Sequence, residues 1–105
     1  MLKLVHFDKH KHLDRLLDIE DRLFGDWGYP QFRNHFMNTS CRIWLAVDEF
    51  ERIHAYTAFQ VRDRSLLVLN QVGNRDGQLF LQAVLECDGL IGGRRVVNAA
   101  ELLEV

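Results

Sequence analysis

A glycine-flanked segment, Gly73–Gly77, is the part of the sequence best suited to binding an anion. It separates an apolar run from a stretch of helical periodicity, so its backbone N–H groups would lie at the start of a helix. Backbone N–H groups in that position, together with the helix dipole, bind phosphate groups. The alternative is an ordinary turn in which the glycines supply positive φ angles, and the sequence leaves both interpretations open.

Histidines form the second set of chemically capable residues. His6, His10 and His12 are close in sequence, as the ligands of many metal sites are. They fall on a predicted strand end, a loop and a helix start, so their side chains would converge only by accident. A zinc site needs three or four converging ligands with supporting hydrogen bonds. We therefore expect no metal, and we interpret His35 and His54 as surface or half-buried packing residues.

Hydrophobic periodicity predicts the elements that position these residues. The expected strands are 2–7, 41–47, 53–61, 66–72 and 95–99, and the expected helices are 9–24, 29–37 and 78–88. Asp8 is the expected cap of the first helix, Gly73–Gly77 is expected to be a loop, and residues 98–105 could at most begin another helix. The order β-α-α-β-β-β-α-β predicts an α/β domain. Its middle strands should form an antiparallel meander, and the last strand should run parallel to the fourth.

The composition excludes several classes of function. The 105 residues include 13 basic and 15 acidic side chains, and no block is strongly basic, so a nucleic-acid partner is not expected. No apolar run approaches the ~18 residues that a membrane-spanning helix needs, and no secretion signal opens the chain. Two cysteines, Cys41 and Cys87, are too few for a disulfide framework. We expect a cytoplasmic protein with free thiols, in a bacterial or an infected host cell.

The predicted order of elements resembles a Gcn5-related N-acetyltransferase (GNAT) domain, especially the small bacterial enzymes that acetylate protein N-termini. The resemblance is carried by the opening strand with Asp8, the helix LDRLLDIE at 13–20 that ends in Phe24, and the strands WLAVD at 44–48 and IHAY at 53–56. It covers residues 2–99, by pattern more than by identity. It implies a single domain over residues 1–105 with a GNAT-like mixed sheet, truncated after its fifth strand. The last third of the family's domain then has no counterpart.

The resemblance also implies a cofactor, acetyl-CoA. Segment 72–78 would hold its diphosphate, and the splay between the ends of the fourth and fifth strands would complete the site. The residues that the resemblance assigns to cofactor binding are Val72, Gly73, Asn74, Arg75, Gly77 and Gln78. The family's Gly-x-Gly is absent from this loop, and Asp76 would place a negative charge beside the diphosphate. The family commonly carries a general base on or near the fourth strand, but Asn70 and Gln71 cannot abstract a proton. Asp63 is expected in a solvated turn, so the catalytic residues are unknown at this stage.

Two functional hypotheses follow. The first is an acyl-CoA-dependent N-acetyltransferase that acts on an amine or a protein N-terminus. The second is a catalytically inactive GNAT-fold protein that binds another protein, as a regulator or as a small viral or phage protein acting on a host target or in the particle. Aromatic residues crowd positions 24–36, where they would pack the short helices or line an acceptor or partner site. An open sheet edge near Arg95–Ala99 predicts a homodimer or a protein partner there.

Overall fold

The computed structural model of the chain describes residues 1–24, 41–86, 93–98 and 102–104. The expected second helix at 29–37, most of the aromatic segment and Cys87 lie outside these ranges. The elements are β1 (Lys3–His6), α1 (Lys9–Phe24), β2 (Cys41–Val47), β3 (Ile53–Val61), β4 (Ser65–Gly73), α3 (Arg75–Leu85), β5 (Arg95–Asn98) and β6 (Leu102–Glu104). Neither helix in the described part of the chain has the length and apolarity needed to cross a membrane.

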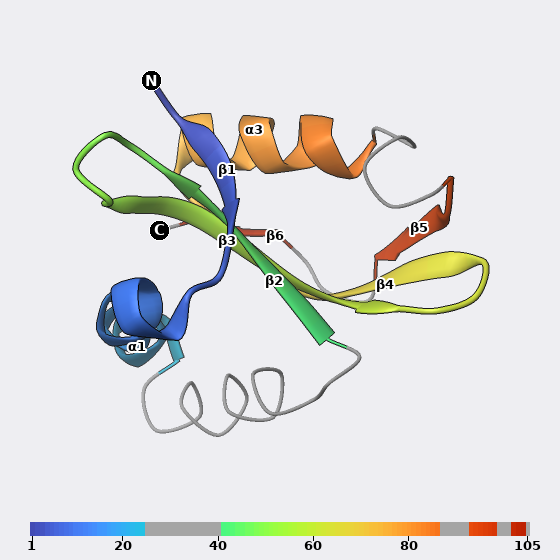
Figure 1. Ribbon diagram of the computed structural model, residues 1–105, viewed down its shortest axis with the longest axis horizontal. Coiled ribbons are helices and arrows are strands. Elements are labelled where there is room, and N and C mark those ends of the chain that lie inside the picture. The colour runs from blue at the N-terminus through green and yellow to red at the C-terminus, as the bar shows by residue number, and fades with distance from the viewer. Residues whose placement is uncertain (25–40, 87–92, 99–101, 105) are drawn as a thin grey trace.

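The strands form one mixed sheet in the order β1-β2-β3-β4-β5, with β6 also paired to β4 (Figure 1). The pairs from β1 to β4 are antiparallel, whereas β5 runs parallel to the first half of β4. This arrangement confirms the predicted meander and the crossover through a helix. β5 ends at Asn98, and its outer edge has no strand partner among the described residues.

Among the described elements, helices α1 and α3 cover opposite faces of this sheet (Figure 1). Strand alternation divides the core accordingly, because successive side chains point to opposite faces. The core on the α1 face contains Leu16, Ile19, Ile43, Leu45, Val47, Tyr56, Ala58 and Val72. The core on the α3 face contains Ala46, Ala55, Phe59, Leu66, Val68, Leu81 and Leu85. Burial of these side chains holds both helices against the central strands.

β4 contains a bulge that changes which helix its side chains face. Two adjacent residues of β3 are paired with Val68 and Asn70, so Leu69 is an extra residue in β4. Val68 packs in the core on the α3 face, but Val72 packs in the core on the α1 face. The bulge therefore turns Asn70 toward the α1 side, where its Nδ2 donates to the Tyr56 hydroxyl.

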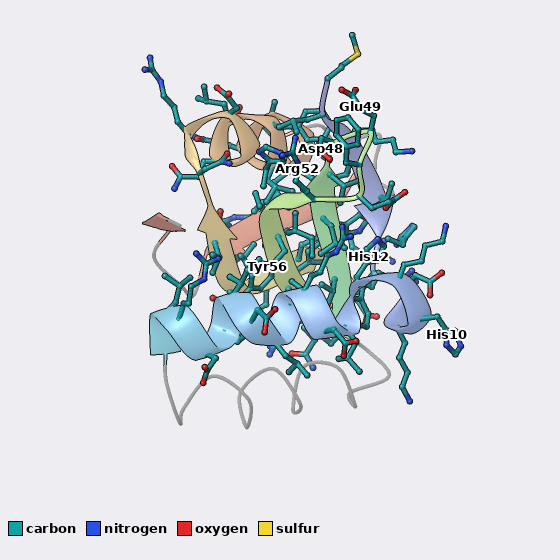
Figure 2. All side chains as sticks on the ribbon, turned by 90° about the vertical axis from the view of Figure 1, so that its left-hand side faces the viewer. His10, His12, Asp48, Glu49, Arg52 and Tyr56 are labelled. Carbon is teal, nitrogen blue, oxygen red and sulfur yellow. The ribbon has the colours of Figure 1, made fainter. Side chains whose placement is uncertain are left out.

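Reciprocal hydrogen bonds define the start of α1 and confirm the predicted cap. The Asp8 carboxylate accepts the backbone N–H of His10 at 2.9 Å, and the Asp8 N–H donates to Nδ1 of His12 at 2.9 Å. His12 is only 2% exposed, whereas His10 points away from the sheet (Figure 2). Asp8 thus defines the start of the helix. The buried His12 side chain takes part in this cap, whereas the His10 side chain is exposed to solvent.

Two local predictions were wrong. Gly73–Gly77 is not a loop, because Gly73 ends β4 and α3 already begins at Arg75. The side chain of Asn74 caps the helix, so one residue suffices to join strand and helix. Within residues 98–105, where a helix start was expected, Leu102–Glu104 instead forms a strand that pairs in parallel with the end of β4. That half of β4 lacks β5 as a neighbour, so its backbone groups bond to β6 instead.

Candidate functional site

The predicted anion site lies where β4 passes into α3. Asn74 has extended backbone angles, and its Oδ1 accepts the backbone N–H of Gly77 at 2.9 Å. Its own backbone N–H donates to the carbonyl of His54 at 2.8 Å. Gln78 turns back to the strand, and its Nε2 donates to the carbonyl of Gly73 at 2.6 Å. Most of the polar groups that sequence assigned to an anion are therefore engaged within the protein.

Close packing explains both glycines of the segment. A Cβ on Gly77 would lie 2.6 Å from Cβ of Ala55 and 2.7 Å from the carbonyl oxygen of His54. A Cβ on Gly73 would lie 2.7 Å from the same Ala55 Cβ. Both distances are shorter than side chains tolerate, so the glycines allow α3 to approach β3. Neither glycine has the positive φ expected of a turn residue. Among the described residues, Gly93 is the glycine with a positive φ.

The exposed first turn of α3 retains two donors. Arg75 and Asp76 begin the helix, and their backbone N–H groups have no acceptor in the described ranges. Such groups carry the positive end of the helix dipole. The side chains of both residues are exposed, one basic and one acidic. Val72, in contrast, is buried in the core on the α1 face.

A polar chain connects the β2–β3 hairpin with this first turn. Asp48 is 6% exposed, and its Oδ2 lies 3.0 Å from Nε2 of His54. Nδ1 of His54 lies 2.8 Å from Nδ2 of Asn74. Asp48 also accepts the backbone N–H groups of Phe50 and Arg52 and the Arg52 guanidinium, at 2.7–3.0 Å. Figure 2 shows Asp48 and Arg52 together at the hairpin end of the sheet.

These contacts fix the charge of Asp48. The hydrogen bond from His54, followed by those from Arg52 and Phe50, holds the pKa of the carboxyl well below its usual range, against the opposing effect of burial. The lowered pKa favours the ionised form of Asp48 at neutral pH. An ionised carboxylate only accepts hydrogen bonds, so it determines which nitrogen of His54 carries the proton.

A second polar cluster is buried between α1 and the sheet. The Tyr56 hydroxyl donates to Oε1 of Glu20, and Nδ2 of Asn70 donates to the Tyr56 hydroxyl at 3.4 Å. Glu20 and Tyr56 are each 1% exposed, and Oε2 of Glu20 has no partner among the described residues. Figure 2 shows Tyr56 directed from β3 toward α1. Burial raises the pKa of Glu20, and the hydrogen bond from Tyr56 offsets this only in part.

Tyr56 is held in its neutral form by the same environment. Burial, followed by the hydrogen bond to Glu20, raises its pKa far above the ordinary value. The cluster thus combines a neutral tyrosine with a carboxyl group that holds its proton more tightly than an exposed one. Groups of this kind are candidates for proton transfer, although structural clusters also have shifted pKa values.

Sequence reasoning missed Glu20 and the role of His54. Glu20 follows Leu16 by four residues and is in line with the apolar face of α1, so a charged residue at an inward-facing helical position was the available signal. His54 is half-buried as expected, but its two ring contacts could not be inferred from strand alternation. Asp63 is exposed in the β3–β4 turn, as predicted. Cys41 is a free thiol, and burial raises its pKa to about 11.

The described residues contain no group of three or more His, Cys, Asp or Glu side chains that could hold a metal ion. His6 packs against Trp44 with ring centroids 3.7 Å apart and ring planes tilted by 40°, and His12 lies 3.4 Å from a carboxylate oxygen of Glu51. These two histidines and His10 therefore point to different surroundings.

Comparison with known proteins identifies the fold. No protein-family model matches the chain, and no curated sequence matches it. Among solved structures, it is similar to the glucosamine N-acetyltransferase region of a fungal multi-domain GH3 β-N-acetylglucosaminidase, with a TM-score of 0.69 and 16% identity. That match covers 96% of this chain and 14% of the fungal chain, so this chain spans a small part of the fungal protein.

Two bacterial structures show the same likeness over most of their length. A ribosomal-protein-alanine N-acetyltransferase from Brucella melitensis matches with a TM-score of 0.66 and 9% identity, over 96% of this chain and 81% of that one. A protein from Clostridium acetobutylicum, described as a predicted acetyltransferase and solved with acetyl-CoA, has a TM-score of 0.59 and 13% identity over 96% and 82%. These likenesses show that the chain has a GNAT-like fold, which confirms the resemblance inferred from the sequence.

Proposed function

We propose that the protein binds an acyl-CoA through the first turn of α3 and transfers the acyl group to an amine. The observation that carries this proposal is the pair of backbone N–H groups of Arg75 and Asp76, which have no acceptor among the described residues and lie just after the carboxyl end of β4 in a GNAT-like sheet. A diphosphate accepts hydrogen bonds from such groups and is attracted by the helix dipole. The acetyl-CoA in the similar Clostridium acetobutylicum structure supports the choice of ligand.

The side chains of the first turn act in opposite directions on this ligand. The guanidinium of Arg75 can form charge-assisted hydrogen bonds with phosphate oxygens. The carboxylate of Asp76 repels them, although it stabilises the empty helix terminus. The residues present therefore fit a diphosphate, with an affinity that Asp76 lowers.

Acyl-CoA, when bound, supplies an activated acyl group to an amine. The new C–N bond replaces the thioester C–S bond, the thiol leaves with a proton, and the amine loses one. We assign the acceptance of that amine proton to Glu20 acting through the Tyr56 hydroxyl. Because both side chains are only 1% exposed, this transfer requires the cluster to open to the bound amine. A carboxyl group whose pKa is raised by burial is a candidate for general acid–base work.

One observation favours the inactive, protein-binding alternative. β6 is paired with Gln71, Val72 and Gly73 at the carboxyl end of β4, where the resemblance implied a splay between strands. The expected splay is therefore not formed over these residues. Under this alternative, the open edge of β5 would be the surface that receives a partner.

Calorimetric titration with acetyl-CoA separates the two proposals. We expect micromolar binding, weakened at least about tenfold by Arg75→Glu, which places a second acid in the first turn. Arg64→Glu, an equal charge change in the exposed β3–β4 turn, is the matched control and should change the affinity little. No heat at high micromolar acetyl-CoA would remove the acyltransferase proposal and leave the protein-binding one.

The assignment of Glu20 needs a measurement of transfer. Release of free CoA thiol is followed with a set of peptide N-termini and small amines as acceptors. Glu20→Gln should keep acetyl-CoA binding and lower the transfer rate at least about a hundredfold. Equal rates for the wild type and Glu20→Gln would show that this carboxyl does not take the proton.

A further inference from the structure

The contacts between Asp48, His54 and Asn74 permit only one arrangement of protons. Asp48 is an acceptor, so Nε2 of His54 must carry the hydrogen that bridges the 3.0 Å between them. At the other end, the backbone N–H of Gly77 is only a donor, so the amide oxygen of Asn74 must face it. The amide nitrogen of Asn74 then faces Nδ1 of His54, which must be the unprotonated nitrogen of a neutral ring.

A second proton on His54 would break this arrangement. Nδ1–H and the amide N–H of Asn74 would then point at each other across 2.8 Å, with no acceptor between them. Rotation of the Asn74 amide by half a turn restores one hydrogen bond, because the amide oxygen then accepts from His54. The same rotation points the amide nitrogen at the N–H of Gly77, so the helix loses its cap.

We propose that His54 is a positioning residue whose protonation uncaps the first turn of α3 through Asn74. This coupling makes binding of the acyl-CoA diphosphate weaker in acid than at neutral pH, a consequence that rests on the proposed function. The N–H groups of Arg75 and Asp76 are adjacent to the capped N–H of Gly77, so loss of the cap disorders the donors that would hold the ligand. His54 thus influences the site without touching the ligand.

Other charged groups near His54 do not provide the same effect. On the hairpin, Asp48 already holds Nε2 in both protonation states, and Arg52 is bound to Asp48. From α1, His12 and Arg15 contact Glu51, through its carboxylate and its backbone carbonyl respectively.

Two further groups complete these surroundings. Glu49 is paired with the chain N-terminus. On α3, the carboxylate of Asp76 is exposed in the first turn, next to the exposed Arg75. Asn74 is the neighbour whose hydrogen bond to His54 must reverse on protonation.

The experiment is a pH titration of the ¹⁵N-labelled protein followed by NMR. Acidification from about pH 8 to about pH 5 spans the range in which histidines titrate. Ring signals report the protonation of His54, and the backbone amide of Gly77 reports the cap. We expect the Gly77 signal to move with the His54 midpoint. Its protection against hydrogen exchange, corrected for the intrinsic pH dependence, should fall about three- to tenfold, as expected for loss of a cap.

Two variants make the result specific. Asn74→Asp keeps the cap but has no donor, so a protonated His54 bonds to it without any rotation. In that variant, Gly77 should stay protected throughout the titration. His10→Gln removes an exposed histidine of α1 and should leave the coupling as in the wild type. Constant protection of Gly77 while wild-type His54 titrates, or an equal loss in Asn74→Asp, would overturn the proposal.

Acetyl-CoA titrations at about pH 8 and about pH 6 connect the coupling to the ligand. We expect wild-type affinity to fall by about the same factor as the Gly77 protection. If acetyl-CoA binds at neither pH while Gly77 still follows His54, the proposed function fails and the coupling stands. If acetyl-CoA binds equally at both pH values while Gly77 follows His54, the effect on the ligand is refuted.

Discussion

His54 and Asn74, twenty positions apart on β3 and at the start of α3, are joined by two hydrogen bonds of 2.8 Å. The backbone carbonyl of His54 accepts the N–H of Asn74, and the ring Nδ1 of His54 accepts from the Asn74 side chain. The backbone bond continues the strand pairing by one residue, and the side-chain bond orients the helix cap. The position of the first turn of α3 is thus set by β3 and the hairpin before it.

The cap of α3 should contribute measurably to stability. Asn74→Ala removes the acceptor for Gly77 and leaves the ring of His54 without its donor, so we expect a loss of about 0.5–2 kcal/mol. Chemical denaturation measures the change. Gln82→Ala, at an exposed position on the same helix, should stay within about 0.5 kcal/mol of the wild type. A cap variant as stable as this control would show that the Asn74 hydrogen bonds contribute nothing net.

The close approach of α3 to β3 makes Gly77 intolerant of any side chain. Gly77→Ala places a methyl group 2.6 Å from Ala55 and 2.7 Å from a backbone carbonyl oxygen. We expect a loss of about 1–3 kcal/mol, because the backbone cannot move aside cheaply. Leu79→Ala, at a residue that is 62% exposed two positions further along the same helix, serves as the control with little expected effect. An unchanged midpoint for Gly77→Ala would mean that the helix and strand are less tightly packed than described.

Periodicity predicted most of the sheet and both described helices, because alternation and the 3.6-residue repeat report directly on burial. It failed at Gly73–Gly77, where the glycines suggested a loop. Their actual cause is the distance between two backbones, which involves Ala55 from another strand and leaves no local mark. It also failed at Leu102–Glu104, where a short segment forms a strand because β4 offers unpaired positions. In both segments, tertiary contacts determine the local structure.

The candidate site was predictable only in part. Glycine and helix patterns placed a helix start just after the fourth strand, which is confirmed, whereas anion binding at that turn stays a prediction. The hydrogen-bonded series Asp48–His54–Asn74 could not be predicted from the sequence. Its three residues lie on separate elements, namely the β2–β3 hairpin, β3 and the start of α3. Glu20 had a usable signal in its inward helical position, but its partner Tyr56 is set by the register of β3.

Glu20 should make stability depend on pH in a defined direction. Its folded-state pKa is raised by burial, so the folded protein holds this proton more tightly than the unfolded chain. The stabilisation is complete below the unfolded carboxyl range and is lost as the pH rises through the folded value. Glu20→Gln, which cannot ionise, should therefore gain stability relative to the wild type on going from acid to neutral pH.

Thermal unfolding between about pH 4 and pH 8 measures this difference. We expect a relative gain of about 1–3 kcal/mol, the usual cost of an unsatisfied buried polar group. Asp21→Asn changes the adjacent, exposed acid of α1 and should show no such trend. A wild-type protein that becomes more stable than Glu20→Gln as the pH rises would contradict the assignment of a raised pKa.

Asp76 should oppose binding of the acyl-CoA diphosphate. Asp76→Asn removes the negative charge from the first turn while keeping its size, and we expect acetyl-CoA affinity to increase several-fold in low salt. The increase should shrink as salt is added. Asp63→Asn, in the exposed β3–β4 turn, is the matched control. An affinity that falls in Asp76→Asn would place the diphosphate elsewhere.

The open edge of β5 predicts self-association or a partner. Val97 is 41% exposed on this edge, and unpaired edge strands pair with other strands unless charged or covered. We expect sedimentation to detect a homodimer at high protein concentration and expect Val97→Lys to shift it toward monomer. A wild-type protein that stays monomeric at high concentration would count against the homodimer.

Backbone amide shifts on addition of acetyl-CoA test the central claim most directly. If the first turn of α3 holds the diphosphate, the largest perturbations fall on the N–H groups of Arg75 and Asp76. Gly77, whose N–H is already bonded to Asn74, should move less. Saturable shifts with this pattern would support an acyl-CoA-binding protein. Shifts centred elsewhere, or none at high micromolar acetyl-CoA, would contradict it.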